Sequence, residues 1–212
     1  MHVLVVGSHG QIGQRLVRAL ERSSHTSRAM VRDTGQRDTL GALGANEVTV
    51  ADLEDDCSQA LVGCDAVIFT AGSGGHTSAE KTKDVDRNGA ISIIDQAAAA
   101  GIRRFIIVSS MNADTPENGS EAMQHYFRAK GAADNHLRES GLDYTIVRPG
   151  KLTDGAGTGR VDIAKDLGRY GEVTRDDVAD VLVATLEMPN TFGRHFELLA
   201  GETPIAQALL GI

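Results

Sequence analysis

The first twenty residues constrain the fold of this chain more than any other segment. Residues 1–6 form a short apolar run of the kind found in buried strands, and the next seven residues hold three glycines at a spacing of three. Apolar residues then recur every four positions, as on the buried stripe of a helix. This order of strand, glycine turn and helix predicts the start of an α/β fold. The glycines are Gly7, Gly10 and Gly13, and the apolar stripe is Ile12, Leu16 and Leu20.

The same turn has the chemistry of a phosphate-binding loop. The first glycine permits a tight turn, the second lets the backbone approach a pyrophosphate, and the third lets helix and strand pack closely. Free N–H groups and the positive end of the helix dipole attract the anion. The alternative is a tight strand-to-helix turn in an α/β protein that binds no nucleotide. The strand before the glycines and the helix after them favour the nucleotide.

Composition narrows the class of protein. A length of 212 residues favours one domain, and a formal net charge of −8 argues against a nucleic-acid surface. No apolar run approaches the roughly 20 residues that span a bilayer, and the N-terminus enters a strand with no signal peptide before it. Cys57 and Cys64 have no His or Cys cluster near them, so we expect free thiols, no metal site and a cytoplasmic location.

Strands and helices are predicted to alternate along the chain. Continuous apolar runs separated by helices are typical of a parallel sheet that is covered on both faces. Ligands of such sheets bind at the carboxyl ends of the strands. The expected strands after the first are 27–31, 46–50, 65–69, 104–108 and 143–147, and the expected longer helices are 83–100 and 120–140, closed by Gly101 and Gly141.

The last sixty residues have a different composition. Residues 151–170 are rich in Gly, Asp and Thr, so we expect a mobile loop there. Thr174 and Asp177 have the spacing of a helix N-cap. A final strand over 195–199 and a short helix complete the prediction. We therefore expect one domain over 1–212, in which residues 151–212 form a small C-terminal appendage on the substrate side.

Two pairs of polar residues are candidates for chemistry. Tyr126 and Lys130 are four residues apart on a predicted helix and therefore share a face. A lysine beside a phenol is expected to lower the phenol pKa, and such a pair can exchange a proton with a carbonyl or alcohol oxygen. Ser109 and Ser110 end a predicted strand at the ligand edge of the sheet. The alternatives are two surface residues at helical spacing and two ordinary strand-end hydroxyls.

Residues at the ends of three further strands fit a dinucleotide. Arg32 follows the second strand, where a guanidinium suits a ribose 2′-phosphate, although Asp33 is next to it. NADP(H) is therefore favoured over NAD(H), against the alternative that Arg32 is a solvated surface charge. Asp52 follows the third strand and has the alternative role of a helix cap. Residues 71–75 form a second glycine loop after the fourth strand.

Together these motifs resemble the atypical short-chain dehydrogenases/reductases, an NAD(P)-binding group similar to the NAD-dependent epimerases/dehydratases. The resemblance covers essentially the whole chain and implies a Rossmann-type doubly wound parallel sheet. The motifs that carry it are Gly7-x-x-Gly10-x-x-Gly13, Arg32, Asp52-Leu53, Ala71-Gly72-Ser73, Ser109-Ser110, Tyr126-x-x-x-Lys130, residues 142–150 (LDYTIVRPG) and residues 174–179 (TRDDVA).

The resemblance implies a role for each matching residue. Tyr126 would be the general acid/base, Lys130 would hold the nicotinamide ribose and tune Tyr126, and Ser110 would orient the substrate oxygen. Asp86 stands where the group usually has an asparagine, which departs from its catalytic pattern. The remaining contacts to cofactor would come from Gly7, Ser8, His9, Gly10, Gln11, Ile12 and Gly13 at the pyrophosphate, Arg32 at the 2′-phosphate, Asp52 and Leu53 at the adenine, Ala71, Gly72 and Ser73 at the ribose and phosphate, and Ser109 and Pro149 at the nicotinamide.

The expected function is an NADP(H)-dependent oxidoreductase that acts on a small carbonyl or alcohol compound. Two other functions are open: a cofactor-binding redox sensor without turnover, and an epimerase or dehydratase that recycles its cofactor. The expected partner is a small-molecule substrate rather than nucleic acid or a membrane. A monomer and a homodimer fit the sequence equally.

Overall fold

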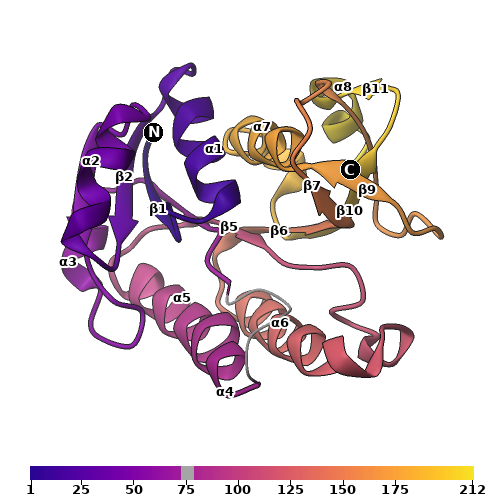
Figure 1. Ribbon diagram of the computed structural model, residues 1–212, viewed down its shortest axis with the longest axis horizontal. Coiled ribbons are helices and arrows are strands. Elements are labelled where there is room, and N and C mark those ends of the chain that lie inside the picture. The colour runs from indigo at the N-terminus through magenta and orange to yellow at the C-terminus, as the bar shows by residue number, and fades with distance from the viewer. Residues whose placement is uncertain (73–78) are drawn as a thin grey trace.

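The structure is a computed structural model that describes residues 1–72 and 79–212 (Figure 1). The strands are β1 (His2–Val6), β2 (Thr26–Val31), β3 (Glu47–Val50), β4 (Ala66–Phe69), β5 (Arg104–Val108), β6 (Asp143–Pro149), β7 (Lys151–Thr153), β8 (Arg160–Ala164), β9 (Glu172–Thr174), β10 (Arg194–Ala200) and β11 (Thr203–Pro204). The α-helices are α1 (Gln11–Glu21), α2 (Arg37–Ala42), α3 (Ser58–Leu61), α4 (Ala79–Thr82), α5 (Ala90–Ala99), α6 (Glu121–Glu139), α7 (Arg175–Thr185) and α8 (Ile205–Leu210). A π-helix, η2 (Lys83–Gly89), joins α4 to α5, and 3-10 turns lie at η1 (Thr34–Gln36), η3 (Pro116–Asn118) and η4 (Pro189–Thr191).

Nine strands of the described chain form one sheet in the order β3-β2-β1-β4-β5-β6-β10-β8-β11. The seven strands from β3 to β10 are parallel, and β8 and β11 add an antiparallel edge. The order β3-β2-β1-β4-β5-β6 is that of a Rossmann fold. The predicted α/β fold with a doubly wound, mostly parallel sheet in one domain is therefore confirmed. The antiparallel edge is an addition that the sequence analysis did not predict.

Helices cover both faces of this sheet (Figure 1). On β1, Val3 and Val5 pack in one core with α1 and α7, whereas Leu4 and Val6 pack in a second core with α3, α5 and α6. Because both faces are buried, the strands have no polar alternation, and this is why they occur as continuous apolar runs in the sequence. The carboxyl ends of β1, β4, β5 and β6 then meet at one edge of the sheet, where ligands of this fold bind.

The helix predicted over 83–100 is divided in the structure. Residues 83–89 are π-helical and only residues 90–99 form a regular α-helix, which ends before Gly101 at a φ of +77°. Inserted π segments are rare and frequently occur at functional sites. The apolar period of the sequence does not reveal the insertion, because one widened turn leaves the stripe nearly unchanged. The π segment carries Asp86, which it packs against α6.

The expectation of a mobile loop over 151–170 is wrong for two parts of that segment, which form strands. Residues 151–153 form β7 and residues 160–164 form β8. The predicted cap is confirmed, since Thr174 Oγ1 accepts a hydrogen bond from the N–H of Asp177 at 3.0 Å. The buried carboxylate of Asp177 in turn accepts the N–H groups of Thr158 and Gly159 at 2.9 and 2.8 Å. These long-range hydrogen bonds order a segment whose composition is typical of a loop.

Substitution of Gly13 by alanine is expected to destabilise the start of the fold. A Cβ at this position would lie 2.6 Å from the Cα of Ser8, so α1 would have to move away from the turn after β1. Such overpacking costs about 1–3 kcal/mol. Urea unfolding measures the effect. The control is Gly41→Ala on α2, where no atom lies within 4 Å of the added Cβ and alanine should stabilise the helix by about 0.5–1 kcal/mol. Equal stability of the two variants would contradict the packing role of Gly13.

Candidate active site

The turn between β1 and α1 has the geometry that a pyrophosphate needs. Gly7 has a φ of +79°, and a Cβ there would lie 2.5 Å from the N atom of Ala71. Gly10 is the N-cap of α1 and provides no side-chain cap, so the first N–H groups of this helix face the turn without a side-chain acceptor. Backbone that is closed to side chains and ends in free N–H groups fits a phosphate.

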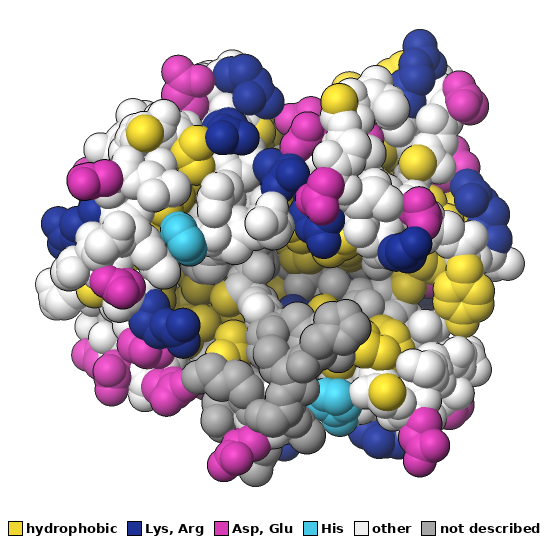
Figure 2. All heavy atoms as spheres, viewed as in Figure 1, with side chains coloured by type: hydrophobic (Ala, Val, Ile, Leu, Met, Phe, Trp, Pro, Cys, Tyr) yellow, Lys and Arg dark blue, Asp and Glu magenta, His cyan; other side chains and the backbone are white. Residues whose placement is uncertain are grey.

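A cleft of about 450 Å³ extends from this turn along the carboxyl ends of β1 to β4. It is lined by eight of the residues that the sequence predicts as cofactor contacts, and by eight that it does not. The predicted residues are Gly7, His9, Gly10, Arg32, Asp52, Leu53, Ala71 and Gly72, and the additional ones include Met30, Gln36 and Thr70. Figure 2 shows a hollow on this side of the molecule with hydrophobic side chains inside it and Lys and Arg side chains at its margin.

Other residues of the turn have structural roles. Ser8 is buried and its Oγ donates a hydrogen bond to the carbonyl of Met30 at 2.7 Å, so its side chain joins β1 to β2 rather than facing the cleft. Ile12 packs in the core, and Gly13 allows α1 to approach the turn. Gln11 starts α1 and, like these three residues, does not line the cleft. Ser73 lies outside the described residues.

The carboxylates of Asp33 and Asp52, two of the acidic residues at or beside the cleft, are engaged in local hydrogen bonds. Asp33 Oδ1 accepts the N–H of Gly35 at 2.8 Å and caps η1. Asp52 Oδ1 accepts the N–H of Glu54 at 3.1 Å, in the capping role considered as its alternative, although Asp52 also lines the cleft. Arg32 is exposed and lines the cleft. A cation, rather than the neighbouring Asp33, is therefore presented toward the ligand.

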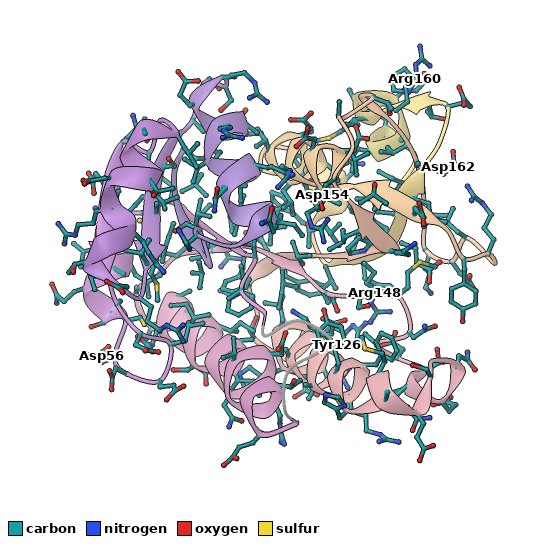
Figure 3. The ribbon with its side chains drawn as sticks, viewed as in Figure 1. Asp56, Tyr126, Arg148, Asp154, Arg160 and Asp162 are labelled. Carbon is teal, nitrogen blue, oxygen red and sulfur yellow. The ribbon has the colours of Figure 1, made fainter. Side chains whose placement is uncertain are left out.

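The predicted Tyr126 and Lys130 lie together on α6 (Figure 3). The Nζ of Lys130 is 5.7 Å from the centre of the Tyr126 ring. The same Nζ is buried and lies 3.0 Å from Oδ1 of Asp86, and it donates to the carbonyls of Val108 at 3.2 Å and Ala71 at 3.4 Å. These three contacts engage all three N–H groups of the ammonium. The longest of them, to Ala71, faces the side of the nucleotide cleft.

The titration of these two groups differs from the expectation. Burial raises the pKa of Tyr126, and the opposing effect of Lys130 does not overcome it, because the carboxylates of Asp86 and Asp134 act in the same direction as burial. The predicted lowering of the Tyr126 pKa is therefore wrong in its net direction. Burial alone would lower the pKa of Lys130, but Tyr126 and Asp86 outweigh it and raise the pKa. The site thus holds an ammonium beside a protonated phenol.

A second ionic network, which the sequence analysis missed, lies behind this pair. Asp134 is fully buried, and its Oδ2 accepts hydrogen bonds from Ser109 Oγ at 2.9 Å and from Arg148 Nη2 at 2.7 Å. Arg148 also donates to both carboxylate oxygens of Asp114, at 2.6 and 2.8 Å. Asp134 is four residues after Lys130 on the same face of α6, and this spacing could have identified it. Burial raises the pKa of Asp134, and the positive charge of Arg148 opposes this increase.

The network fixes the strand ends that the sequence assigns to the nicotinamide. Ser109 directs its hydroxyl to Asp134, so its side chain is a structural link between β5 and α6. Pro149 is buried at the end of β6, and its carbonyl accepts the N–H of Met111 at 3.4 Å. Ser110 is partly buried and follows β5 at the ligand edge of the sheet.

A second cleft, of about 680 Å³, begins at Met111, the residue after Ser110. Its walls come from the loop between β5 and α6, from Arg148 at the end of β6, from the segment between β8 and β9, and from β10. It contains none of the residues of the nucleotide cleft. The two clefts are therefore separate volumes, and Ser110, Tyr126 and Lys130 line neither of them.

Comparison with known proteins now identifies the group to which the chain belongs. A family model described as NAD(P)H-binding matches residues 7–189. The chain belongs to the NAD(P)H-binding family. This result confirms the resemblance to atypical, epimerase/dehydratase-like short-chain dehydrogenases/reductases. Members of the group are of oxidoreductase and epimerase type.

Individual relatives of this NAD(P)H-binding protein carry both kinds of name. The "Uncharacterized sugar epimerase YhfK" of Bacillus subtilis is 50% identical over 99% of both chains. A Bacillus halodurans structure, provisionally named an NAD-dependent epimerase/dehydratase, has a TM-score of 0.97 at 43% identity over the full length of both chains. The anaerobilin reductase ChuY of Escherichia coli has a TM-score of 0.78 at 26% identity, over 94% of this chain and 97% of its own.

The described part of the chain has neither a membrane-spanning helix nor a cluster of metal-binding side chains. None of its helices combines the length and the apolar character needed to cross a membrane. Within residues 1–72 and 79–212, no three His, Cys, Asp or Glu side chains gather closely enough to hold a metal ion. Both cysteines are buried as free thiols, and burial raises the pKa of Cys57 to about 11.

Replacement of Asp86 by asparagine is expected to lower the pKa of Tyr126. The carboxylate of Asp86 disfavours the phenolate, and the isosteric amide removes that charge while Lys130 stays in place. Absorbance at 295 nm follows phenol ionisation, and subtraction of a Tyr126→Phe titration isolates this residue. Asp95→Asn, which changes an exposed carboxylate on α5, is the control and should leave the curve unchanged. An unshifted curve for Asp86→Asn would contradict the electrostatic role of Asp86.

Proposed function

We propose that this protein is an NADP(H)-dependent reductase that acts on a small carbonyl compound in the cytoplasm. The observation that carries the proposal is the partly buried phenol of Tyr126, beside the ammonium of Lys130, at the carboxyl edge of a dinucleotide-binding sheet. A protonated phenol is a proton donor, and a carbonyl oxygen that receives a hydride on its carbon needs one. Family membership supports the cofactor class, and the reductase name of a structural relative supports the direction.

The glycine turn and the nucleotide cleft would hold the dinucleotide. Gly7 and Gly10, with the N-terminus of α1, would bind the pyrophosphate, and Asp52 and Leu53 would flank the adenine. Arg32 would bind the 2′-phosphate of NADP(H). The preference for NADP(H) rests on Arg32, which lines the cleft, whereas Asp33 lies outside the lining residues and uses Oδ1 to cap η1.

The bound nicotinamide supplies the hydride. Tyr126 would donate its phenolic proton to the substrate oxygen, and Ser110 would orient that oxygen by a hydrogen bond. Lys130 would stabilise the phenolate that remains, and would hold the nicotinamide ribose by redirecting the N–H group that now contacts the carbonyl of Ala71. Asp86 and the carbonyl of Val108 keep the ammonium in place during this exchange. Positioning of the substrate and cofactor together would provide much of the rate enhancement.

Cofactor-recycling epimerisation is a second candidate, which the names of two relatives favour. In that reaction the cofactor stays bound and is regenerated, so the protein would consume no NADPH. A sensor without turnover is the remaining alternative, and it too predicts no consumption of NADPH, together with a response of the protein to the oxidation state of the bound cofactor.

Tyr126→Phe is expected to reduce turnover about 10²–10⁴-fold, the usual contribution of a positioned general acid, while NADPH affinity stays the same. The assay is NADPH oxidation against a panel of quinones, aldehydes and ketones, with affinity measured by cofactor fluorescence. Tyr144→Phe, on β6 outside both clefts, is the matched control and should retain activity. Retained activity in Tyr126→Phe would overturn the assignment, and no turnover by the wild-type protein would favour recycling or sensing.

Arg32→Gln is expected to weaken NADPH binding about 10–100-fold and to leave NADH binding nearly unchanged. The estimate follows from the worth of a hydrogen bond to a charged group. Equilibrium titration of both cofactors gives the ratio. The control is Arg22→Gln, because Arg22 pairs with Asp180 away from the cleft. Equal loss of affinity for NADPH and NADH would contradict a contact between Arg32 and the 2′-phosphate.

A further inference from the structure

The second cleft is built from segments that the sequence keeps far apart. Met111 and Asn112 come from the loop after β5, Lys165 and Tyr170 from the segment between β8 and β9, and His195 from β10. The hydroxyl of Tyr170 donates to Oδ1 of Asn112 at 3.2 Å and so connects two of these segments. The bidentate pair of Arg148 with Asp114 anchors the loop after β5. These contacts hold the walls of the cleft in place before a ligand enters.

The acidic groups of this cleft already have hydrogen-bond donors. Both oxygens of Asp114 accept from Arg148. Asp166 Oδ1 accepts the N–H of Gly168 at 2.7 Å, and Glu197 Oε2 accepts the N–H of Leu167 at 2.8 Å. Each carboxylate is therefore engaged in holding a wall.

The basic groups are less engaged. Arg169 pairs with Asp162, but the ammonium of Lys165 and the imidazole of His195 have no hydrogen-bond partner among the described residues. Burial lowers the pKa of His195, and Arg148, Arg138 and Lys165 lower it further against the single opposing carboxylate of Asp114. The charges near His195 thus act together as a positive field. The ammonium of Lys165 is a hydrogen-bond donor and the imidazole of His195 can donate one N–H, so a ligand that complements both is an acceptor with negative charge.

We propose that the second cleft is the substrate site and that it selects carbonyl compounds bearing a carboxylate, which Lys165 and His195 bind. The proposal rests on the proposed reductase function, since the cleft begins next to Ser110. A volume of about 680 Å³ lies within the 300–1,000 Å³ range of small-molecule sites. A single charge fits better than the double charge of a phosphate, because the carboxylates of Asp114, Asp166 and Glu197 equal in number the cations Arg148, Lys165 and Arg169, and Lys165 is the cation of this set without a hydrogen-bond partner among the described residues.

The test compares an acid with its uncharged ester. The probes are 4-carboxybenzaldehyde and methyl 4-formylbenzoate, assayed by NADPH oxidation at fixed ionic strength. We expect kcat/KM for the acid to exceed that for the ester about 10-fold, the usual effect of one hydrogen bond between charged groups. Lys165→Gln should abolish this preference by lowering kcat/KM for the acid alone. Lys151→Gln, on β7 and outside the cleft, is the matched control and should retain the preference.

A binding measurement separates this proposal from the proposed function. Calorimetric titration of the protein with saturating NADP⁺ compares 4-(hydroxymethyl)benzoate with its methyl ester. Tighter binding of the acid than of the ester, together with loss of this difference in Lys165→Gln, supports the carboxylate site. This holds even if neither aldehyde is reduced, and in that case only the proposed reductase function fails. Three results would overturn the carboxylate site. The first is equal kcat/KM and equal affinity for the acid and the ester. The second is a preference for the acid that survives Lys165→Gln, and the third is no binding of the acid at millimolar concentration. A tighter complex with 4-(hydroxymethyl)phenyl phosphate than with the acid would also overturn it.

Discussion

The candidate site depends on one buried ion pair. Lys130 and Asp86 are both inaccessible to solvent and lie 3.0 Å apart, one on α6 and the other on the π-helix η2. Loss of one partner would leave an unpaired buried charge at a cost of about 3–5 kcal/mol. The pair therefore ties two helices together beneath the ends of β4 and β5. Every other group of the site, including the phenol of Tyr126, takes its position or its protonation state relative to this pair.

The pair also explains why a widened helix is retained in the fold. The π-helix makes a less favourable turn than an α-helix, and such turns persist where a side chain must occupy a particular place. Here the side chain is that of Asp86, whose Oδ1 meets the ammonium of Lys130 beside Gly72, a residue that lines the nucleotide cleft. The ammonium can then exchange its longest contact, to the carbonyl of Ala71, for a ligand while its charge stays neutralised. In the proposed mechanism, structural stability and ligand binding would therefore use different N–H groups of Lys130.

The parts of the structure that the sequence predicts are those governed by local pattern. The glycine turn, the buried strands and the placement of Tyr126 beside Lys130 follow from spacing within one or two elements, and the structure has all three. The direction in which the Tyr126 pKa shifts could not be predicted, because burial and the carboxylates of Asp86 and Asp134 decide it. Asp134 was within reach, since it shares a helix face with Lys130, but its partner Arg148 comes from β6.

The second cleft was beyond prediction for a different physical reason. Its floor and one wall depend on the reversal of direction between β10 and β8, and short strands rich in polar residues do not specify their pairing locally. The carboxylate of Asp177 positions β8 instead, because it accepts hydrogen bonds from the N–H groups of Thr158 and Gly159 immediately before that strand. An N-cap at the start of α7 therefore also positions the strand that leads into Lys165. The part of the fold that forms the nucleotide cleft follows from periodicity, whereas the part that forms the second cleft depends on a buried carboxylate, Asp177, that accepts backbone hydrogen bonds from a distant segment.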